Sequence, residues 1–250
     1  MNKLLCILLS CGISGIVFGQ APFQEIPFQE KPDTLVIPAA LSYTILFSEG
    51  DTISLSNGKW ARAKGGHDMT LVLPDATDKL TTLVISHECN DSSSLLGDGG
   101  GLSLVPITLT NDHWKVSGPI KNVDFTIVGG TYDNCSGTLV EGKNTILTAE
   151  EGTPESNEAL SKHGRGYRDV SDFNGLPRYK NTGWIVEVDP KTNKAIQKLY
   201  GMGRFYHESV LVMEDGKTVY LTDDFAPSVF FKFIAEQKND FSKGQLYAYK

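Results

Sequence analysis

The chain has 250 residues, a net charge of −7 at pH 7 and 25 glycines. This acidic balance argues against nucleic acid and anionic membrane surfaces as partners, since both select basic patches. Frequent glycine, together with the lack of a convincing amphipathic helix, predicts an all-β protein. We expect one short helical turn, at Ser156–Lys162.

The first twenty residues have the order of a secretory signal peptide. Lys3 gives a positive start, residues 4–18 are almost wholly apolar, and Gly19 precedes the expected cleavage point. We therefore expect residues 1–19 to be removed and the protein to be periplasmic or secreted, with no membrane attachment afterwards. A lipoprotein alternative stays open because Leu8, Leu9 and Ser10 precede Cys11.

A repeat organises the next two hundred residues. Gly65–Glu88, Asp133–Glu151 and Tyr206–Asp224 each open with polar residues of the kinds that bind metals. Each continues through a β-rich run and a turn rich in Asp, Gly, Lys or Asn, and returns on a second β-rich run that ends in acidic residues. The pattern predicts three antiparallel hairpins.

Hairpin geometry predicts where the polar residues meet, because the start of the first strand lies beside the end of the second. The expected neighbours are Glu208 with Asp223 and Asp224, Cys135 with Glu150 and Glu151, and His67 and Asp68 with Glu88. Carboxylates gathered in this way repel one another unless a cation or a proton intervenes. The sequence therefore predicts a metal site at these hairpin edges.

Two further strand candidates follow each hairpin. They are Leu102–Leu109 and Trp114–Ser117, Gly183–Val188 and Ala195–Tyr200, and Ser228–Ile234 and Gln245–Tyr249. Four antiparallel strands per unit predict a β-propeller, with about three blades in residues 63–250, a half-ring of a six-bladed propeller. A β-sandwich is the competing all-β interpretation.

The remaining segments join or complete these units. Residues 20–62 lead into the propeller and hold strand candidates at Tyr43–Phe47 and Thr52–Leu55, whereas the long connection 152–181 is typical of a lid or binding loop. A half-ring has open edges, which proteins normally avoid. We therefore expect a C-terminal half beyond Lys250, or a dimer partner, to complete the ring.

Three stretches resemble PhoX-type alkaline phosphatases. Leu83–Glu88 resembles a family strand that ends Asn-His-Glu, with Ser86 at the Asn position. Cys135–Glu151 resembles the family's cysteine-containing hairpin ending Leu-Thr-Cys-Glu-Glu, and Gly203–Asp224 resembles a later hairpin. The resemblance runs from about Gly65 to Lys250.

The resemblance implies an exported β-propeller phosphatase that uses calcium and iron to hydrolyse small phosphate esters. It implies that Cys135 is an iron ligand and that Glu151 and Glu208 are carboxylate ligands shared between iron and calcium, these three forming the catalytic centre. The full set of implied metal ligands is Glu88, Cys135, Glu150, Glu151, Glu208, Asp223 and Asp224.

Two questions stay open from the sequence. Cys89 and Cys135 are the only cysteines after the signal peptide, so they could form a disulfide or, alternatively, Cys135 could bind metal. The alternative to a phosphatase is a non-catalytic calcium-binding propeller that acts as a binding or structural module.

Overall fold

The computed structural model describes residues 35–38, 41–55, 57–77, 79–162 and 166–249, in two compact units, Met1–Thr44 and Ile45–Lys250. The expected signal peptide, residues 1–19, lies outside the described residues. The second unit holds all the strands and helices discussed below. Among the described residues, no helix has the length and apolar character needed to cross a membrane.

The first sheet contains the four strands expected of the first propeller blade and three further short strands. Its strands are β1 (Thr52–Ser54), β2 (Trp60–Arg62), β3 (His67–Thr77), β4 (Leu80–His87), β5 (Leu102–Thr110), β6 (His113–Val116) and β7 (Lys121–Asn122). Strands β3 to β6 form an antiparallel meander, and β7 also pairs with β5. The parallel pairing of β1 with β7 at Ser54 and Lys121 adds the β1–β2 hairpin.

The second and third sheets are four-stranded and antiparallel, as predicted. The second has β8 (Asn134–Val140), β9 (Thr145–Glu150), β10 (Ile185–Asp189) and β11 (Lys194–Lys198), and the third has β12 (His207–Val212), β13 (Thr218–Asp223), β14 (Phe231–Gln237) and β15 (Asp240–Ala248). The prediction of a strand at Tyr43–Phe47 was wrong, because those residues have no strand pairing. Strands β14 and β15 form a longer hairpin than expected, turning at Asn239, whose φ is 60°.

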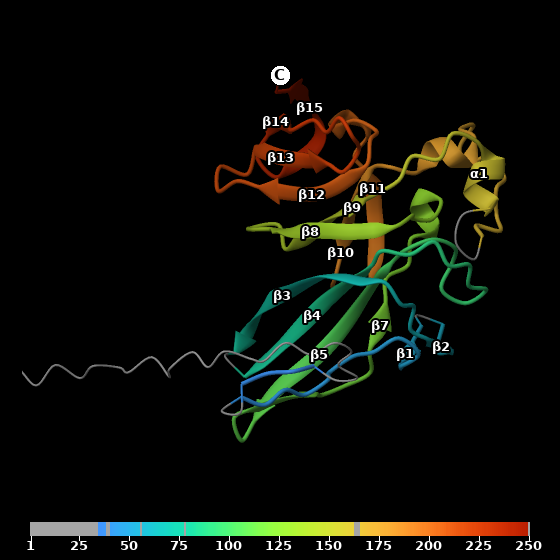
Figure 1. Cartoon of the computed structure of the whole chain (residues 1–250). Coiled ribbons are helices and arrows are strands. Elements are labelled where there is room, and N and C mark those ends of the chain that lie inside the picture. Colours follow the sequence, from blue (N-terminus) through green and yellow to red (C-terminus); the bar gives the residue numbers. More distant parts are fainter. Residues whose placement is uncertain (1–34, 39–40, 56, 78, 163–165, 250) are drawn as a thin grey trace, which may run out of the picture. The chain divides into compact units, whose positions relative to one another are not determined.

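The three sheets pack face to face in chain order. Met69, Val84 and Leu104 of the first sheet share a buried core with Ile146, Val186 and Val188 of the second. Leu147 and Leu199 of the second sheet share another core with Leu221 and Phe233 of the third. The first strands are neighbours, since β8 contacts both β3 and β12 (Figure 1). This stacking brings the three predicted hairpins together along one line.

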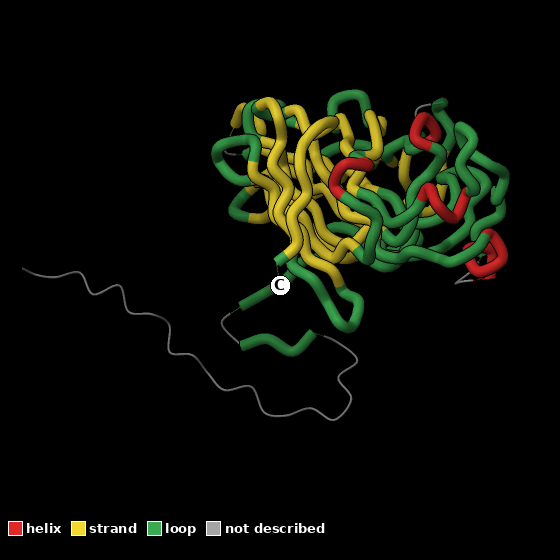
Figure 2. The backbone as a smooth tube through the Cα atoms, turned by 90° about the horizontal axis from the view of Figure 1, so that it is seen from above, coloured by secondary structure: helices red, strands yellow, loops and turns green. Residues whose placement is uncertain are grey.

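The connection between β9 and β10 forms a separate layer of loops and short helices. It contains α1 (Asn157–Lys162), which confirms the expected helical turn, and the 3-10 helix Arg178–Asn181; two more 3-10 helices lie at Thr126–Val128 and Tyr200–Met202. The Ser156 hydroxyl accepts a hydrogen bond from the Ala159 N–H at 3.0 Å and so caps α1. Leu160 packs against Tyr132 and Tyr167. Figure 2 shows most of the helical turns and loops gathered beside the strands.

Candidate metal centre

Each of the three hairpins ends with the same local geometry. The last paired positions are His67 with His87, Asn134 with Glu150, and His207 with Asp223. In all three, the register shifts directly after the first residue of the pair, which is the mark of a β-bulge. A bulge turns the next side chain in a new direction. The repeat seen in the sequence is therefore also a repeat of backbone geometry.

Six side chains occupy equivalent positions, because each belongs to the residue that directly follows a member of one of these pairs in the sequence. They are Asp68 and Glu88, Cys135 and Glu151, and Glu208 and Asp224. We call this set the edge cluster. The structure thus confirms the expected proximity of Cys135 to Glu151 and of Asp68 to Glu88.

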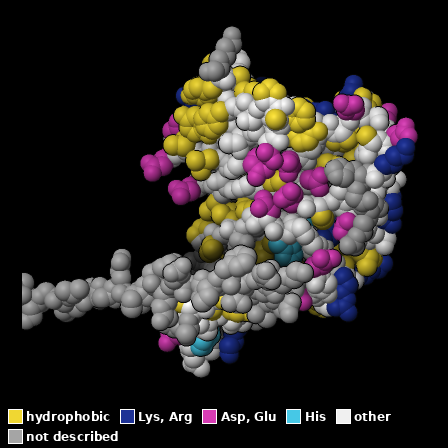
Figure 3. Space-filling view, in the orientation of Figure 1, with side chains coloured by type: hydrophobic (Ala, Val, Ile, Leu, Met, Phe, Trp, Pro, Cys, Tyr) yellow, Lys and Arg dark blue, Asp and Glu magenta, His cyan; other side chains and the backbone are white. Residues whose placement is uncertain are grey.

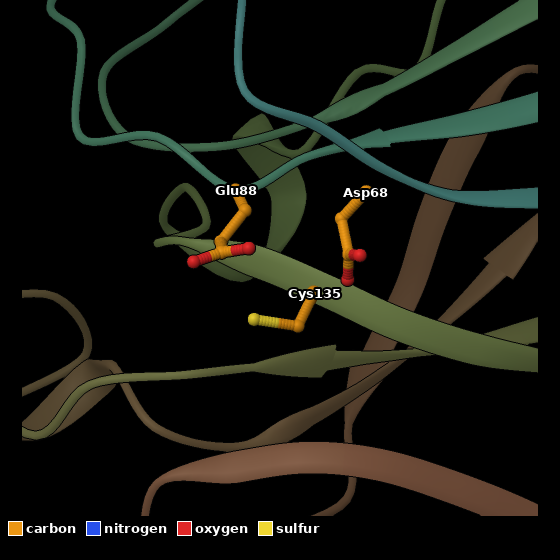
Figure 4. Close-up of side chains that lie close together, drawn as sticks. All are labelled: Asp68, Glu88 and Cys135. Atoms are coloured by element: carbon orange, nitrogen blue, oxygen red, sulfur yellow. The ribbon is translucent and has the colours of Figure 1, made fainter. Parts of the chain in front are cut away.

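Cys135 lies at the centre of the edge cluster. Ligand atoms of Asp68, Glu88 and Cys135 all lie within 4.8 Å of one another, and so do those of Cys135, Glu151 and Glu208. The Cys135 Sγ is 3.0 Å from Glu151 Oε2. Figure 4 shows Asp68, Glu88 and Cys135 converging from two different sheets, and Figure 3 shows acidic side chains gathered on this face. The two groups share the thiol and could each hold a cation.

Negative charge in the edge cluster has no basic side chain to compensate it within the described part of the chain. Burial raises the pKa of Glu88, and the nearby carboxylates of Glu151 and Asp68 raise it further. Burial and the Glu151 carboxylate likewise raise the pKa of Glu208. Over the described ranges, no lysine or arginine forms an ion pair with a member of the edge cluster. A bound cation would supply the missing counter-charge.

The thiol of Cys135 is held in its protonated form without a metal. Burial raises its pKa, and the hydrogen bond to Glu151 adds to the rise. Both cysteines are free thiols in the structure, so the disulfide alternative is not realised there. A metal at this position would have to displace the thiol proton, which the adjacent Glu151 carboxylate can accept.

Two implied ligands are not brought to the edge cluster. The Glu150 carboxylate is fully buried and pairs with Lys198 Nζ at 2.8 Å. Burial raises the pKa of Asp223, while the backbone amides of Val229 and Phe225 oppose that rise. Both residues belong to the last backbone pair of their hairpins, so their side chains lie on the other side of the strand from Glu151 and Asp224. Sequence reasoning omitted Asp68 as a ligand, although its position in the repeat is equivalent to that of Cys135.

Buried histidines support two of the hairpin ends. His87 is hydrogen-bonded through Nδ1 to the Gly65 carbonyl at 3.0 Å and through Nε2 to the Ser103 hydroxyl at 2.8 Å. His207 Nε2 lies 3.0 Å from the Gly203 carbonyl. Burial lowers the pKa of each histidine to about 4, so both are neutral near pH 7. They fix the backbone next to Glu88 and Glu208.

A cavity of about 630 Å³ opens directly beside the edge cluster. Glu88 and Glu151 form one part of its lining, and Tyr132, Tyr206 and Pro154 form another. Residues of the connection between β9 and β10 therefore contribute to the wall, and the lid or binding-loop role of this connection stays a prediction. The cavity is large enough for a small organic ester whose polar end faces the carboxylates.

Comparisons with known proteins point to one family. A family model described as alkaline phosphatase PhoX matches residues 107–248, more than half of the chain, and this range includes Cys135, Glu151 and Glu208. No curated protein matches the chain. Among solved structures, the major allergen Mala s 1 of Malassezia sympodialis is similar at 13% identity and a TM-score of 0.36, over 81% of this chain and 78% of that one.

Proposed function

Since the chain belongs to the PhoX alkaline phosphatase family, we propose that it is an exported, metal-dependent phosphatase that hydrolyses small phosphate esters at the edge cluster. The observation that supports this function most strongly is the threefold recurrence of one ligand position. Three hairpins each supply two side chains from equivalent backbone positions, and four of the carboxylates gather with the thiol, with no ion-pair partner among the described residues.

The donor set fits the two metals that the family resemblance implies. Carboxylate oxygens are the ligands that calcium prefers, and a thiolate suits iron better than calcium. We propose that Cys135 would hold iron, that Glu151 and Glu208 would serve both metals, and that Asp68 and Glu88 would hold calcium. The two triads found in the structure place Asp68 and Glu88 on one side of Cys135 and Glu151 and Glu208 in the other group, which supports two adjoining cation positions.

Bound cations of this kind neutralise phosphate oxygens and lower the pKa of a bound water. The protein's own contribution is to position the ester and to manage protons. The Cys135 thiol donates a hydrogen bond to Glu151 Oε2, so this carboxylate would accept the thiol proton and pass it to the water of the cavity when the thiol binds a metal. Tyr206 and Tyr132, in the cavity wall, place the ester's organic group away from the carboxylates.

The stacking of the three sheets supports a propeller as the complete fold. Their first strands are neighbours, and their hairpin ends meet at one site. The outer face of the third sheet also exposes large apolar side chains, namely Leu211, Phe230, Ile234, Tyr247 and Tyr249. An apolar sheet face of this size normally packs on another sheet. We propose that the three sheets are blades around an axis lined by β3, β8 and β12.

A phosphatase assay tests the function. Purified protein is stripped with a chelator, reloaded with calcium and iron, and assayed with p-nitrophenyl phosphate. We expect hydrolysis only after reloading, and a loss of at least about 100-fold in Cys135→Ser and Glu151→Gln. Glu141→Gln, at the turn end of the same hairpin, is the matched control and should keep full activity. Metal binding without hydrolysis in the wild type would instead favour a non-catalytic calcium-binding module.

A further inference from the structure

A continuous polar network lies directly behind the edge cluster. It begins at Lys198 on β11, whose Nζ donates to both carboxylate oxygens of Glu150 at 2.8 and 3.1 Å and also to the Asn181 carbonyl. The side chains of Lys198 and Glu150 are 1% and 0% exposed. The backbone N–H of Trp184 donates to the second Glu150 oxygen at 3.1 Å. Both charged groups are therefore buried and hydrogen-bonded to other protein atoms.

The network continues from Glu150 into the first sheet. The Thr131 hydroxyl lies 2.9 Å from Glu150 Oε1 and 2.9 Å from Asn134 Oδ1, and with its single proton it donates to one of these two acceptors at a time. Asn134 Oδ1 accepts a hydrogen bond from the Gly101 N–H at 2.7 Å. The Gly101 carbonyl in turn accepts one from the His87 N–H at 2.9 Å. The path therefore runs from the second sheet to the end of β4.

Three members of this network are sequence neighbours of metal-ligand candidates. Glu150 precedes Glu151, Asn134 precedes Cys135, and His87 precedes Glu88. Glu150 and Asn134 take part through their side chains and His87 through its N–H, so the network fixes the residue directly before each of these three ligand candidates. Packing there is close, because a Cβ on Gly100 would lie 2.4 Å from Asn134 Oδ1 and 2.6 Å from the His87 carbonyl oxygen.

We propose that the Glu150–Lys198 pair, acting through Thr131 and Asn134, is a positioning device that sets the spacing of Cys135, Glu151 and Glu88 for metal binding. The proposal rests on the proposed metal centre and adds residues that do not touch the metal. Glu150 thus acts behind the site, and Lys198 becomes a residue on which metal geometry depends. Outer partners of this kind orient ligands and tune metal affinity.

The second sheet offers a matched control at its other end. Glu187 is also fully buried, and it pairs with Lys143 at 2.6 Å and accepts a hydrogen bond from the Thr145 hydroxyl at 2.8 Å. Thr145 pairs with Val140 at the turn end of the β8–β9 hairpin, opposite the Asn134–Glu150 end. Removing Lys143 therefore takes the cation from another fully buried glutamate without touching the network behind the edge cluster.

Cobalt(II) titration of the full chain tests the proposal. A thiolate–cobalt bond gives a charge-transfer band in the near ultraviolet, and its absence in Cys135→Ser assigns the band to Cys135. We expect Lys198→Met to weaken cobalt binding by about 10- to 100-fold and to shift or reduce the band. Lys143→Met should leave both unchanged.

A second variant separates positioning from stability. Glu150→Gln combined with Lys198→Met removes both charges, and replacing a buried pair with neutral groups often preserves stability. We expect this double variant to melt near the wild-type temperature and still show the weakened band. A wild-type band and affinity in the double variant would overturn the positioning role while leaving the metal centre intact. Absence of the band in the wild type would overturn the thiolate metal centre itself, and the positioning role with it.

Discussion

The two ends of the β12–β13 hairpin shift the pKa of a carboxyl group in opposite directions. At the turn end, Asp215 accepts hydrogen bonds at 2.8 Å from the N–H groups of Lys217 and Thr218, and another at 2.7 Å from the Thr218 hydroxyl. These donors lower the pKa of Asp215 to about 2. At the other end, burial and the Glu151 carboxylate raise the pKa of Glu208. The same hairpin thus has one end that satisfies its own negative charge and one that does not.

The difference indicates which acidic residues belong to a site. A turn carboxylate with its own donors contributes to folding and needs no other partner. The edge cluster contains several carboxylates and a thiol with no cationic partner among the described residues, so its charge has to be met from outside. The number of acidic residues at a strand end therefore says less than the number of donors around them.

The largest expected effect comes from breaking the ion pair behind the cluster. Lys198→Met should lower the free energy of unfolding by about 3–5 kcal/mol, because it leaves the buried Glu150 charge without its partner. Lys143→Met should cost about 1–2 kcal/mol, because the Lys143 side chain is 33% exposed and water can replace it. Urea unfolding at pH 7 measures both values. Equal losses of stability in the two variants would mean that the ion pairs at the two ends of the second sheet are equally important for folding.

A smaller effect is expected from the close approach at Gly100. Gly100→Ala should destabilise the protein by about 1–3 kcal/mol, because the added methyl group overlaps Asn134 Oδ1 and the His87 carbonyl oxygen. Gly118→Ala is the control, since a Cβ there meets Pro106 only at an ordinary 3.4 Å. Thermal unfolding of the two variants gives the comparison. Wild-type stability in Gly100→Ala would show that the first and second sheets are not held tightly behind the cluster.

The smallest effects concern pH and have opposite signs at the two ends. Asp215 has a lowered pKa, so its stabilisation is present above pH 3.8 and is lost as the pH falls through about 2. Glu208 has a raised pKa, so in metal-free protein the folded state retains a proton that the unfolded chain has already released, and stability falls as the pH rises above 4.5.

Substitutions should therefore move stability in opposite directions near pH 7. With a chelator present, Asp215→Asn should be less stable than the wild type and Glu208→Gln more stable. Both differences should shrink as the pH falls, that of Glu208→Gln first. Denaturant unfolding between pH 3 and 8 measures them, and a shift of the same sign in both variants would remove the distinction between the ends.

Much of this organisation was predictable because it is local in sequence. The three hairpins and the convergence at Cys135 and Glu151 follow from a repeat in which turn residues and β-rich runs recur in order. The choice between neighbouring acids was not predictable. Glu150 and Asp223 were assigned as ligands beside Glu151 and Asp224, and only the bulge and the last backbone pair determine which carboxylate reaches the cluster.

Other features depend on contacts between distant residues. Strands β1, β2 and β7 are two or three residues long, and they join the first sheet through a pairing of Ser54 with Lys121. The strand candidate Thr52–Leu55 is confirmed by β1, but β2 and β7 carry too little periodicity to be recognised. The Glu150–Lys198 pair is similarly hidden, because it joins residues 48 positions apart on strands that do not pair with each other.

The most direct test of the central claim, that the edge cluster requires a cation, is thermal unfolding with and without calcium. At a calcium concentration about 100 times the dissociation constant, binding stabilises the folded state by about 2.7 kcal/mol, which corresponds to a rise in Tm of about 5–10 °C. We expect this rise in the wild type and in Glu214→Gln, at the turn end, and its near-complete loss in Glu208→Gln. An unchanged Tm in the wild type, or the same rise in both variants, would contradict the account.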